Sequence, residues 1–244
     1  MRAIVRLDIK NDNVVKGINF DGLRVVGKPI DLAKKYYENG ADEIFYIDCV
    51  ASLYGQNNLT NIILQSAKNI FIPFCAGGGI RNIDDATKFL RSGADKVILN
   101  TAAIENPLVV NTLVKNLGSQ SVVLSVEAKK ISPGKWEAYK NFGRDRSGLD
   151  AIEWVKESKN LGVGEILLTS IENEGRGNGF DIELYEECNG LVDVPIIASG
   201  GFQKLEHIEE LISKTDVEGF TISQALHYNK ITLKEIKKYL ANNC

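Results

Sequence analysis

The chain has 244 residues, of which 44% are hydrophobic and 25% charged, and its formal net charge at pH 7 is −3. This balance argues against a nucleic-acid-binding or membrane-surface protein, and a core of this size requires neither disulfides nor a metal. The four cysteines show no metal or redox spacing, and we expect neither a signal peptide nor a membrane span. We therefore expect a cytoplasmic protein with free thiols and without a metal or cofactor.

Short apolar runs alternate with amphipathic stretches along the chain. The runs predict strands at residues 3–9, 43–47, 72–76, 96–99, 121–127, 165–169, 195–199 and 219–222. The clearest helical patterns lie at residues 30–39, 83–92, 107–117, 148–161, 205–214 and 233–240. A strand followed by a helix, repeated eight times in about 250 residues, is typical of the (β/α)₈ or TIM barrel. No linker divides the chain, so we expect residues 1–244 to form one domain.

The two halves of the chain repeat each other around two glycine turns. Residues 76–80 and 198–202 each follow an apolar run and precede a helical pattern. A constant offset extends the match to residues 100–102 and 222–224. Repetition at half the chain length predicts a two-fold internal repeat of half-barrels, at about 1–120 and 121–244.

Each glycine turn predicts a phosphate cradle, because a turn from a strand into a helix exposes backbone N–H groups. The first cradle would use Gly78, Gly79, Asn100 and Thr101. The second would use Gly175, Gly200, Gly201 and Ser223. One Gly-Gly turn could equally serve close packing of a helix on a strand. Two turns at equivalent places indicate a ligand with a phosphate at each end.

Two carboxylates end strands that lie opposite each other in an eight-stranded barrel. Asp8 ends the first strand and Glu127 the fifth, so both belong to the barrel end that holds active sites. One can take a proton while the other gives one, if their environments separate their pKa values. The alternative is that they are solvated or cap the next helix. Lys16, in a long loop at residues 11–27, could close over an anionic substrate, and a solvated lysine fits the pattern equally.

Charged residues also open four of the predicted strands, at the opposite end of the barrel. Their alternating signs could form a ring that closes the barrel bottom, and the four are Arg2, Glu43, Lys96 and Glu165. Spacing alone favours the simpler interpretation, in which they only solubilise that face.

Motifs over essentially the whole chain resemble the cyclase subunit of imidazole glycerol phosphate synthase. They are Leu7-Asp8-Ile9-Lys10, Val14-Val15-Lys16-Gly17, Gly77-Gly78-Gly79-Ile80-Arg81, Gly93-Ala94-Asp95-Lys96-Val97, Asn100-Thr101-Ala102, Gly164-Glu165-Ile166-Leu167-Leu168-Thr169-Ser170 and Ala198-Ser199-Gly200-Gly201. The resemblance implies a (β/α)₈ barrel that forms a heterodimer with a glutaminase subunit. In that family, ammonia from the glutaminase passes through the barrel and reacts with a bisphosphorylated aminoimidazole ribulosyl substrate, and the resemblance implies the same reaction here. The products are imidazole glycerol phosphate and an aminoimidazole carboxamide nucleotide.

The resemblance also assigns roles by position. Asp8 matches the first catalytic aspartate of the family, Glu127 stands at the second, and Lys16 matches the loop lysine. Asp95 matches an aspartate that contacts the partner. The ring of Arg2, Glu43, Lys96 and Glu165 matches all four members of an ammonia gate, which overturns the simpler interpretation of those charges.

Several residues depart from the family pattern at the top of the barrel. Glu127 is one methylene longer than the family's aspartate. Arg6 replaces a cysteine, and it points to the same side of the first strand as Asp8. A buried guanidinium needs an anionic partner, for which Asp8, Asp48 or Glu127 could serve. The second cradle is altered by Glu174, Arg176 and Gln224, whereas the first is nearly intact.

Three alternatives to the cyclase remain. The departures also resemble a paralogous branch that is thought to supply ammonia for the acetamidino modification of an N-acetyl sugar in surface-glycan synthesis. A non-catalytic barrel that only docks and activates a glutaminase is the second alternative, and an Arg6 locked to Asp8 would favour it. The sister isomerase of the histidine pathway is the third, and the complete charged ring speaks against it.

Overall fold

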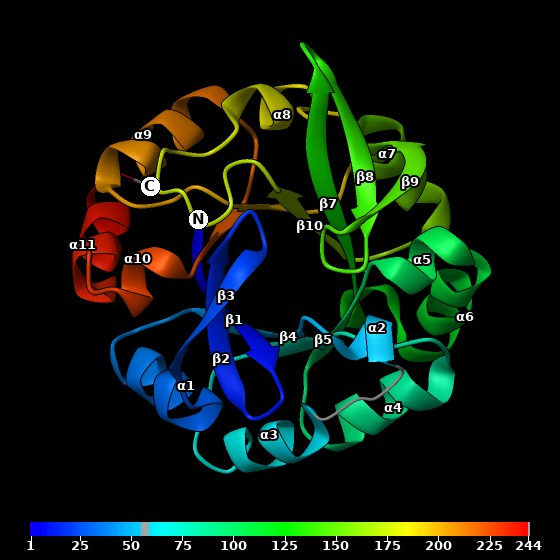
Figure 1. The fold of residues 1–244 in the computed structure, drawn as a ribbon, viewed down its shortest axis with the longest axis horizontal. Coiled ribbons are helices and arrows are strands. Elements are labelled where there is room, and N and C mark those ends of the chain that lie inside the picture. Colours follow the sequence, from blue (N-terminus) through cyan, green and yellow to red (C-terminus); the bar gives the residue numbers. More distant parts are fainter. Residues whose placement is uncertain (55–58, 244) are drawn as a thin grey trace.

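The computed structural model describes residues 1–54 and 59–243, and its centre is a closed barrel of eight parallel strands (Figure 1). Around the barrel they are β1 (Arg2–Lys10), β4 (Glu43–Asp48), β5 (Phe74–Gly77), β6 (Lys96–Leu99), β7 (Val122–Ser132), β10 (Glu165–Ser170), β11 (Ile196–Ser199) and β12 (Gly219–Ile222). The parallel pair of β1 with β12 closes the circle. Each strand overlaps one of the predicted apolar runs, and the predicted (β/α)₈ TIM barrel is confirmed.

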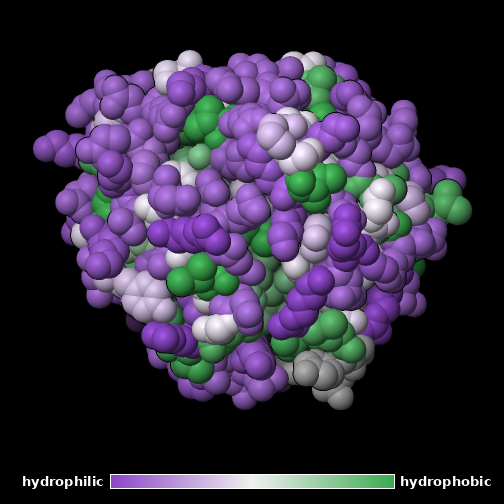
Figure 2. Space-filling model, turned by 45° about the horizontal axis from the view of Figure 1, so that its top comes forward, coloured by the Kyte–Doolittle hydropathy of each residue, from purple (hydrophilic) through white to green (hydrophobic). Residues whose placement is uncertain are grey.

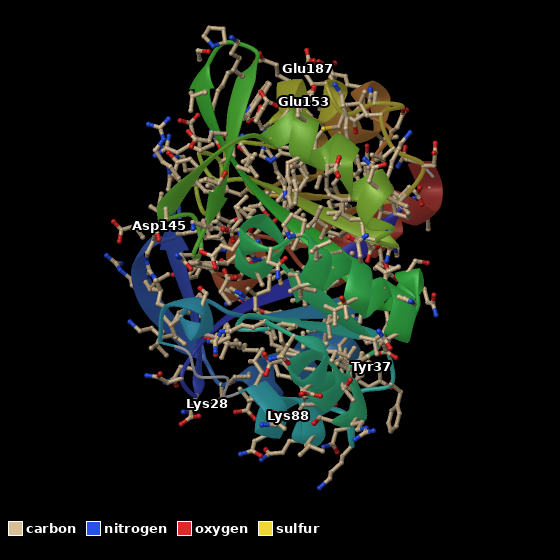
Figure 3. All side chains as sticks on the ribbon, turned by 90° about the vertical axis from the view of Figure 1, so that its right-hand side faces the viewer. Lys28, Tyr37, Lys88, Asp145, Glu153 and Glu187 are labelled. Carbon is tan, nitrogen blue, oxygen red and sulfur yellow. The ribbon has the colours of Figure 1, made fainter. Side chains whose placement is uncertain are left out.

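Helices surround the strands on the outside (Figure 1). They are α1 (Pro29–Glu38), α2 (Ala51–Tyr54), α3 (Leu59–Ser66), α4 (Ile83–Arg91), α5 (Thr101–Glu105), α6 (Leu108–Leu117), α7 (Ala151–Leu161), α8 (Ile182–Glu186), α9 (Leu205–Lys214), α10 (Gln224–His227) and α11 (Leu233–Asn243), with a 3₁₀ turn at Ser119–Ser121. Lys88 on α4 and Glu153 on α7 are exposed, and their side chains point away from the barrel (Figure 3). The predicted helix at 148–161 begins only at Ala151, because Asp150 caps α7 by accepting hydrogen bonds from the backbone N–H groups of Ile152 and Glu153.

The core divides into two layers because successive strand residues point to opposite faces of the sheet. Val5 and Leu7 of β1 point outward and pack under the helices. Ile4 of β1 points inward, where it meets Phe45, Leu167 and other apolar residues that fill the barrel. By the same alternation Arg6 and Asp8 also point inward, which places their charges inside the barrel.

Two antiparallel ribbons extend the barrel strands. Strands β2 (Asn13–Ile18) and β3 (Asp21–Gly27) follow β1, and β8 (Lys135–Lys140) and β9 (Asp145–Asp150) follow β7. The prediction of a loop at 11–27 was therefore wrong. The ribbons follow the first strands of the two expected half-barrels, while the internal repeat and the single-domain boundary stay predictions.

The face of the molecule shown in Figure 2 is mainly hydrophilic. On the face in Figure 2, the hydrophobic residues form small groups between polar ones. Among the helices in the described part of the chain, none is long and apolar enough to cross a lipid bilayer.

Candidate active site at the carboxyl ends of the barrel strands

Asp8 and Glu127 lie on opposite strands at the same end of the barrel. Three strands separate β1 from β7 in either direction around the closed sheet. The two side chains are almost completely buried, with exposed fractions of 2% for Asp8 and 4% for Glu127. Burial at this depth makes their charge states depend on the few groups that contact them.

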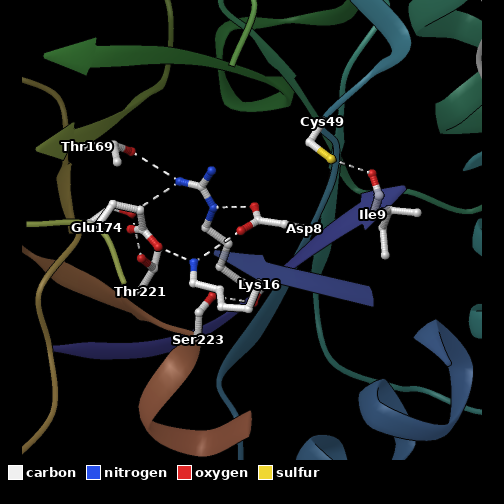
Figure 4. A network of polar contacts seen from close by, with 10 residues as sticks. Asp8, Ile9, Lys16, Cys49, Thr169, Glu174, Thr221 and Ser223 are labelled. Carbon is white, nitrogen blue, oxygen red and sulfur yellow. Dashed lines mark hydrogen bonds and ion pairs between the residues drawn. The ribbon is translucent and has the colours of Figure 1, made fainter. Parts of the chain in front are cut away.

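Asp8 is held by two cations. Its Oδ1 accepts a hydrogen bond from Arg6 Nε at 2.8 Å, and its Oδ2 accepts one from Lys16 Nζ at 3.1 Å (Figure 4). Burial alone would raise the pKa of Asp8, but Arg6 and Lys16 outweigh burial and hold that pKa below its usual value. Asp8 is therefore a fixed anion and a weak base.

Glu127 has a different environment. Its Oε2 accepts a hydrogen bond from the backbone N–H of Gly143 at 2.8 Å. Burial raises the pKa of Glu127 to about 7, although Arg6 and this hydrogen bond favour the charged form. The two carboxylates thus differ in pKa as an acid/base pair requires, and Glu127 is the one that can exchange a proton near neutral pH.

Arg6 lies across the barrel interior and is only 1% exposed. Its Nη1 donates to Thr169 Oγ1 at 3.2 Å and to Ser199 Oγ at 3.3 Å. Its Nη2 has no hydrogen-bond partner among residues 1–54 and 59–243. Asp8 is thus the carboxylate that pairs directly with Arg6, one of the three partners expected from the sequence.

Two aromatic rings flank the Arg6 guanidinium, and the sequence reasoning missed them. The centre of the guanidinium lies 5.1 Å from the ring centroid of Phe20 and 5.8 Å from that of Phe142, and these rings also contact each other. Cation–π contacts of this kind stabilise a desolvated guanidinium. The signal was present in the sequence, because an Asn-Phe pair recurs at 19–20 and 141–142, at the offset that relates Gly78 to Gly200.

The four residues of the first predicted phosphate cradle lie around one cavity of about 120 Å³. Gly78 and Gly79 have φ angles of 106° and 72°, and a Cβ on Gly78 would come within 2.4 Å of the carbonyl oxygen of Asp48. Thr101 Oγ1 accepts a hydrogen bond from the backbone N–H of Asn141 at 3.0 Å. The cavity reaches Glu127, so an anion held here would present the rest of its molecule to that carboxylate.

The residues of the second predicted cradle also come together, but the space between them is only about 10 Å³. That is about the space that one water molecule requires. Glu174 lines this space together with Gly175, Gly200 and Ser223. The Ser223 hydroxyl donates to the carbonyl oxygen of Arg6 at 2.7 Å. In this arrangement its proton does not point to a ligand in the cradle.

Lys16 is a buried strand residue and not a loop residue that extends into solvent. It lies in β2, is 3% exposed, and pairs with the carboxylates of Asp8 and Glu174. Burial alone would lower the pKa of Lys16, but Glu174 and Asp8 raise it above its usual value. The sequence analysis did not predict this burial, because the contact joins β2 to the loop after β10, in the other half of the chain.

The four charges at the barrel bottom form a closed ring of ion pairs. Arg2 pairs with Glu43 at 2.8 Å and with Glu165, and Lys96 pairs with Glu43 at 3.0 Å and with Glu165 at 2.8 Å. Cys75 lies at this ring and donates from Sγ to Glu43 Oε1 at 3.0 Å. Every cation therefore contacts both carboxylates, as a barrier across the barrel opening would need.

Asp95 lies beside this ring, one residue before β6. It is exposed, and its Oδ2 accepts a hydrogen bond from the backbone N–H of Phe74 at 2.9 Å. The carboxylate thus holds the first residue of β5 in place, while Asp95 remains exposed to solvent at the barrel bottom.

Comparison with known proteins shows which family this chain belongs to. The family described as "Histidine biosynthesis protein" matches residues 2–232. The imidazole glycerol phosphate synthase subunit HisF of Legionella pneumophila is 52% identical over 206 residues, which cover 84% of this chain and 97% of that protein. HisF of Bacillus cereus (strain ATCC 10987 / NRS 248) is 42% identical over 241 residues, which cover 99% of this chain and 96% of that protein. A second Bacillus cereus HisF, from strain Q1, gives the same identity and coverage. The chain belongs to the HisF family of imidazole glycerol phosphate synthase subunits.

Proposed function

We propose that this chain is the cyclase subunit of imidazole glycerol phosphate synthase. It uses ammonia to convert a bisphosphorylated aminoimidazole ribulosyl substrate into imidazole glycerol phosphate and an aminoimidazole carboxamide nucleotide. The observation that carries the proposal is the pair of opposed carboxylates with separated pKa values, one of which lines the cavity of the first cradle. The identity with HisF proteins over nearly the whole chain supports it.

The proton chemistry follows from the two environments. Cyclisation with ammonia requires a group that donates a proton and accepts one again near neutral pH, and Glu127 fits this role with a pKa of about 7. Asp8 stays ionised and stabilises positive charge that develops on nitrogen. A phosphate at Gly78 and Gly79 anchors the substrate beside Glu127.

Ammonia would enter from the opposite end of the barrel. A glutaminase subunit docks at the bottom, next to Asp95, and forms a heterodimer with this chain. The ring of Arg2, Glu43, Lys96 and Glu165 serves as the gate, and it must open at least one ion pair to admit ammonia. The apolar barrel interior then leads upward to Arg6 and Asp8.

One observation favours a second candidate function. The ion pair of Arg6 with Asp8 is the feature expected of a barrel that only docks and activates a glutaminase. The two functions differ in what Asp8→Asn does to the assembled complex. A cyclase loses product formation while glutamine hydrolysis continues, whereas a scaffold shows unchanged activity. The glycan-associated alternative is tested by offering the ribulosyl substrate, which such a paralogue would not convert.

A further inference from the structure

The two cradles differ in the free volume that they leave for a ligand. The first surrounds an open cavity of about 120 Å³, whereas the second has about 10 Å³ left. The Glu174 side chain lines the second, and its Oε2 lies 3.5 Å from the point where a Cβ on Gly200 would stand. Glu174 is 4% exposed, so its carboxylate is inside the cradle and not in solvent.

Lys16 connects this carboxylate to the proposed catalytic centre. Its ammonium group lies between Glu174 and Asp8 and pairs with both (Figure 4). Lys16 thus bridges the two buried anions, and Asp8 has Arg6 as its second cation, so Lys16 is the cation that pairs directly with Glu174. A phosphate entering the second cradle would bring up to two further negative charges against Glu174, where the low dielectric strengthens repulsion.

The surrounding backbone holds this arrangement closed. The backbone N–H of Asn19 donates to the carbonyl oxygen of Glu174 at 2.7 Å, and Arg176 Nε donates to Asn19 Oδ1 at 3.0 Å. A Cβ on Gly175 would stand 2.1 Å from the carbonyl oxygen of Gly17, so the two backbones are in close contact. The β2–β3 ribbon is therefore tied to the loop after β10 at Glu174 and at the two residues that follow it.

We infer that Glu174 is an internal competitor of phosphate at the second cradle and determines how many phosphates a ligand can place in the site. With Glu174 in place, the chain holds a ligand through one phosphate, at Gly78 and Gly79. A second phosphate enters only when Glu174 leaves the cradle and releases Lys16. The inference rests on the proposed function for the identity of both cradles as phosphate sites.

The test counts phosphates directly. Equilibrium dialysis with radiolabelled inorganic phosphate measures the number bound per chain, and crystals soaked in phosphate locate them. The wild type is expected to bind one, at Gly78 and Gly79, and Glu174→Ala to bind two, with the second site at least tenfold tighter than in the wild type. Glu174→Gln keeps the shape without the charge and should fall between them, while Glu172→Ala, a matched acid in the same loop, should behave as the wild type.

Either of two results would overturn the inference. One is phosphate at Gly200 and Gly201 of the wild type while the Glu174–Lys16 pair stays intact. The other is a Glu174→Ala protein that binds the same number of phosphates as the wild type, including none. Because the assay uses no ribulosyl substrate, a protein that lacks cyclase activity but gains a phosphate in Glu174→Ala would refute the proposed function and leave this inference standing.

Discussion

Arg6 and Asp8 form an ion pair inside the barrel, with Arg6 Nε 2.8 Å from Asp8 Oδ1. They stand two residues apart on β1, so strand periodicity alone turns both side chains inward. The pair keeps Asp8 charged and leaves Glu127 as the carboxylate that titrates near neutral pH.

Replacing Arg6 tests whether this pair supports the fold. Arg6→Met is expected to lower the free energy of unfolding by about 3 kcal/mol, because Asp8 would retain only Lys16 in a buried site. Urea denaturation at pH 7 measures the change. Arg24→Met on the exposed face of β3 is the control and should stay within about 0.5 kcal/mol of the wild type. Equal effects of the two substitutions would show that the buried pair is not stabilising.

Glu127 predicts a pH dependence of stability. Its pKa in the folded chain is about 7 against an ordinary value of 4.5, so the folded state favours its protonated form. That contribution is complete below pH 4.5 and is lost as pH rises through 7, which amounts to about 3 kcal/mol. The difference in unfolding free energy between the wild type and Glu127→Gln should fall by this amount from pH 4.5 to pH 8. A constant difference would contradict the raised pKa.

If the ring at the barrel bottom is an ammonia gate, its disruption should change turnover with glutamine and turnover with ammonium salt differently. Lys96→Met removes one of the two cations that contact both Glu43 and Glu165. Turnover with glutamine and the partner should fall, while turnover with ammonium salt should persist, because external ammonia can reach the open end of the barrel. Lys88→Met on the outer face of α4 is the control for both assays. An equal loss with both sources would argue against a gate.

Substitution of Gly78 by alanine should lower both the free energy of unfolding and the binding of phosphate at the first cradle. A Cβ there would approach the Asp48 carbonyl oxygen to 2.4 Å, whereas a Cβ on Gly134 would meet nothing within 4 Å. Both residues have positive φ angles, so each substitution by alanine costs about 1 kcal/mol of backbone strain. Gly78→Ala should lose about 2 kcal/mol more by urea denaturation, and it should also lose binding of inorganic phosphate. Similar losses for both variants would show that the close approach has no energetic effect.

The local sequence pattern was sufficient to predict much of the fold. The eight barrel strands follow from apolar runs, and the side of Arg6 follows from alternation along β1. The two ribbons were missed because residues 11–27 and 128–147 mix charged and apolar side chains without a clear period, and their pairing with β1 and β7 defines them. The burial of Lys16 depends on Glu174, which only the closed barrel brings near, so no local signal could reveal it.

The cyclase assignment is tested most directly by supplying ammonium salt and the ribulosyl substrate to the purified chain without a partner. Formation of imidazole glycerol phosphate is the expected result, and Asp8→Asn should reduce its rate at least about 100-fold, because the fixed anion facing Glu127 is lost. Circular dichroism confirms that both proteins are folded. A folded wild-type chain that releases no imidazole glycerol phosphate under these conditions would contradict the assignment.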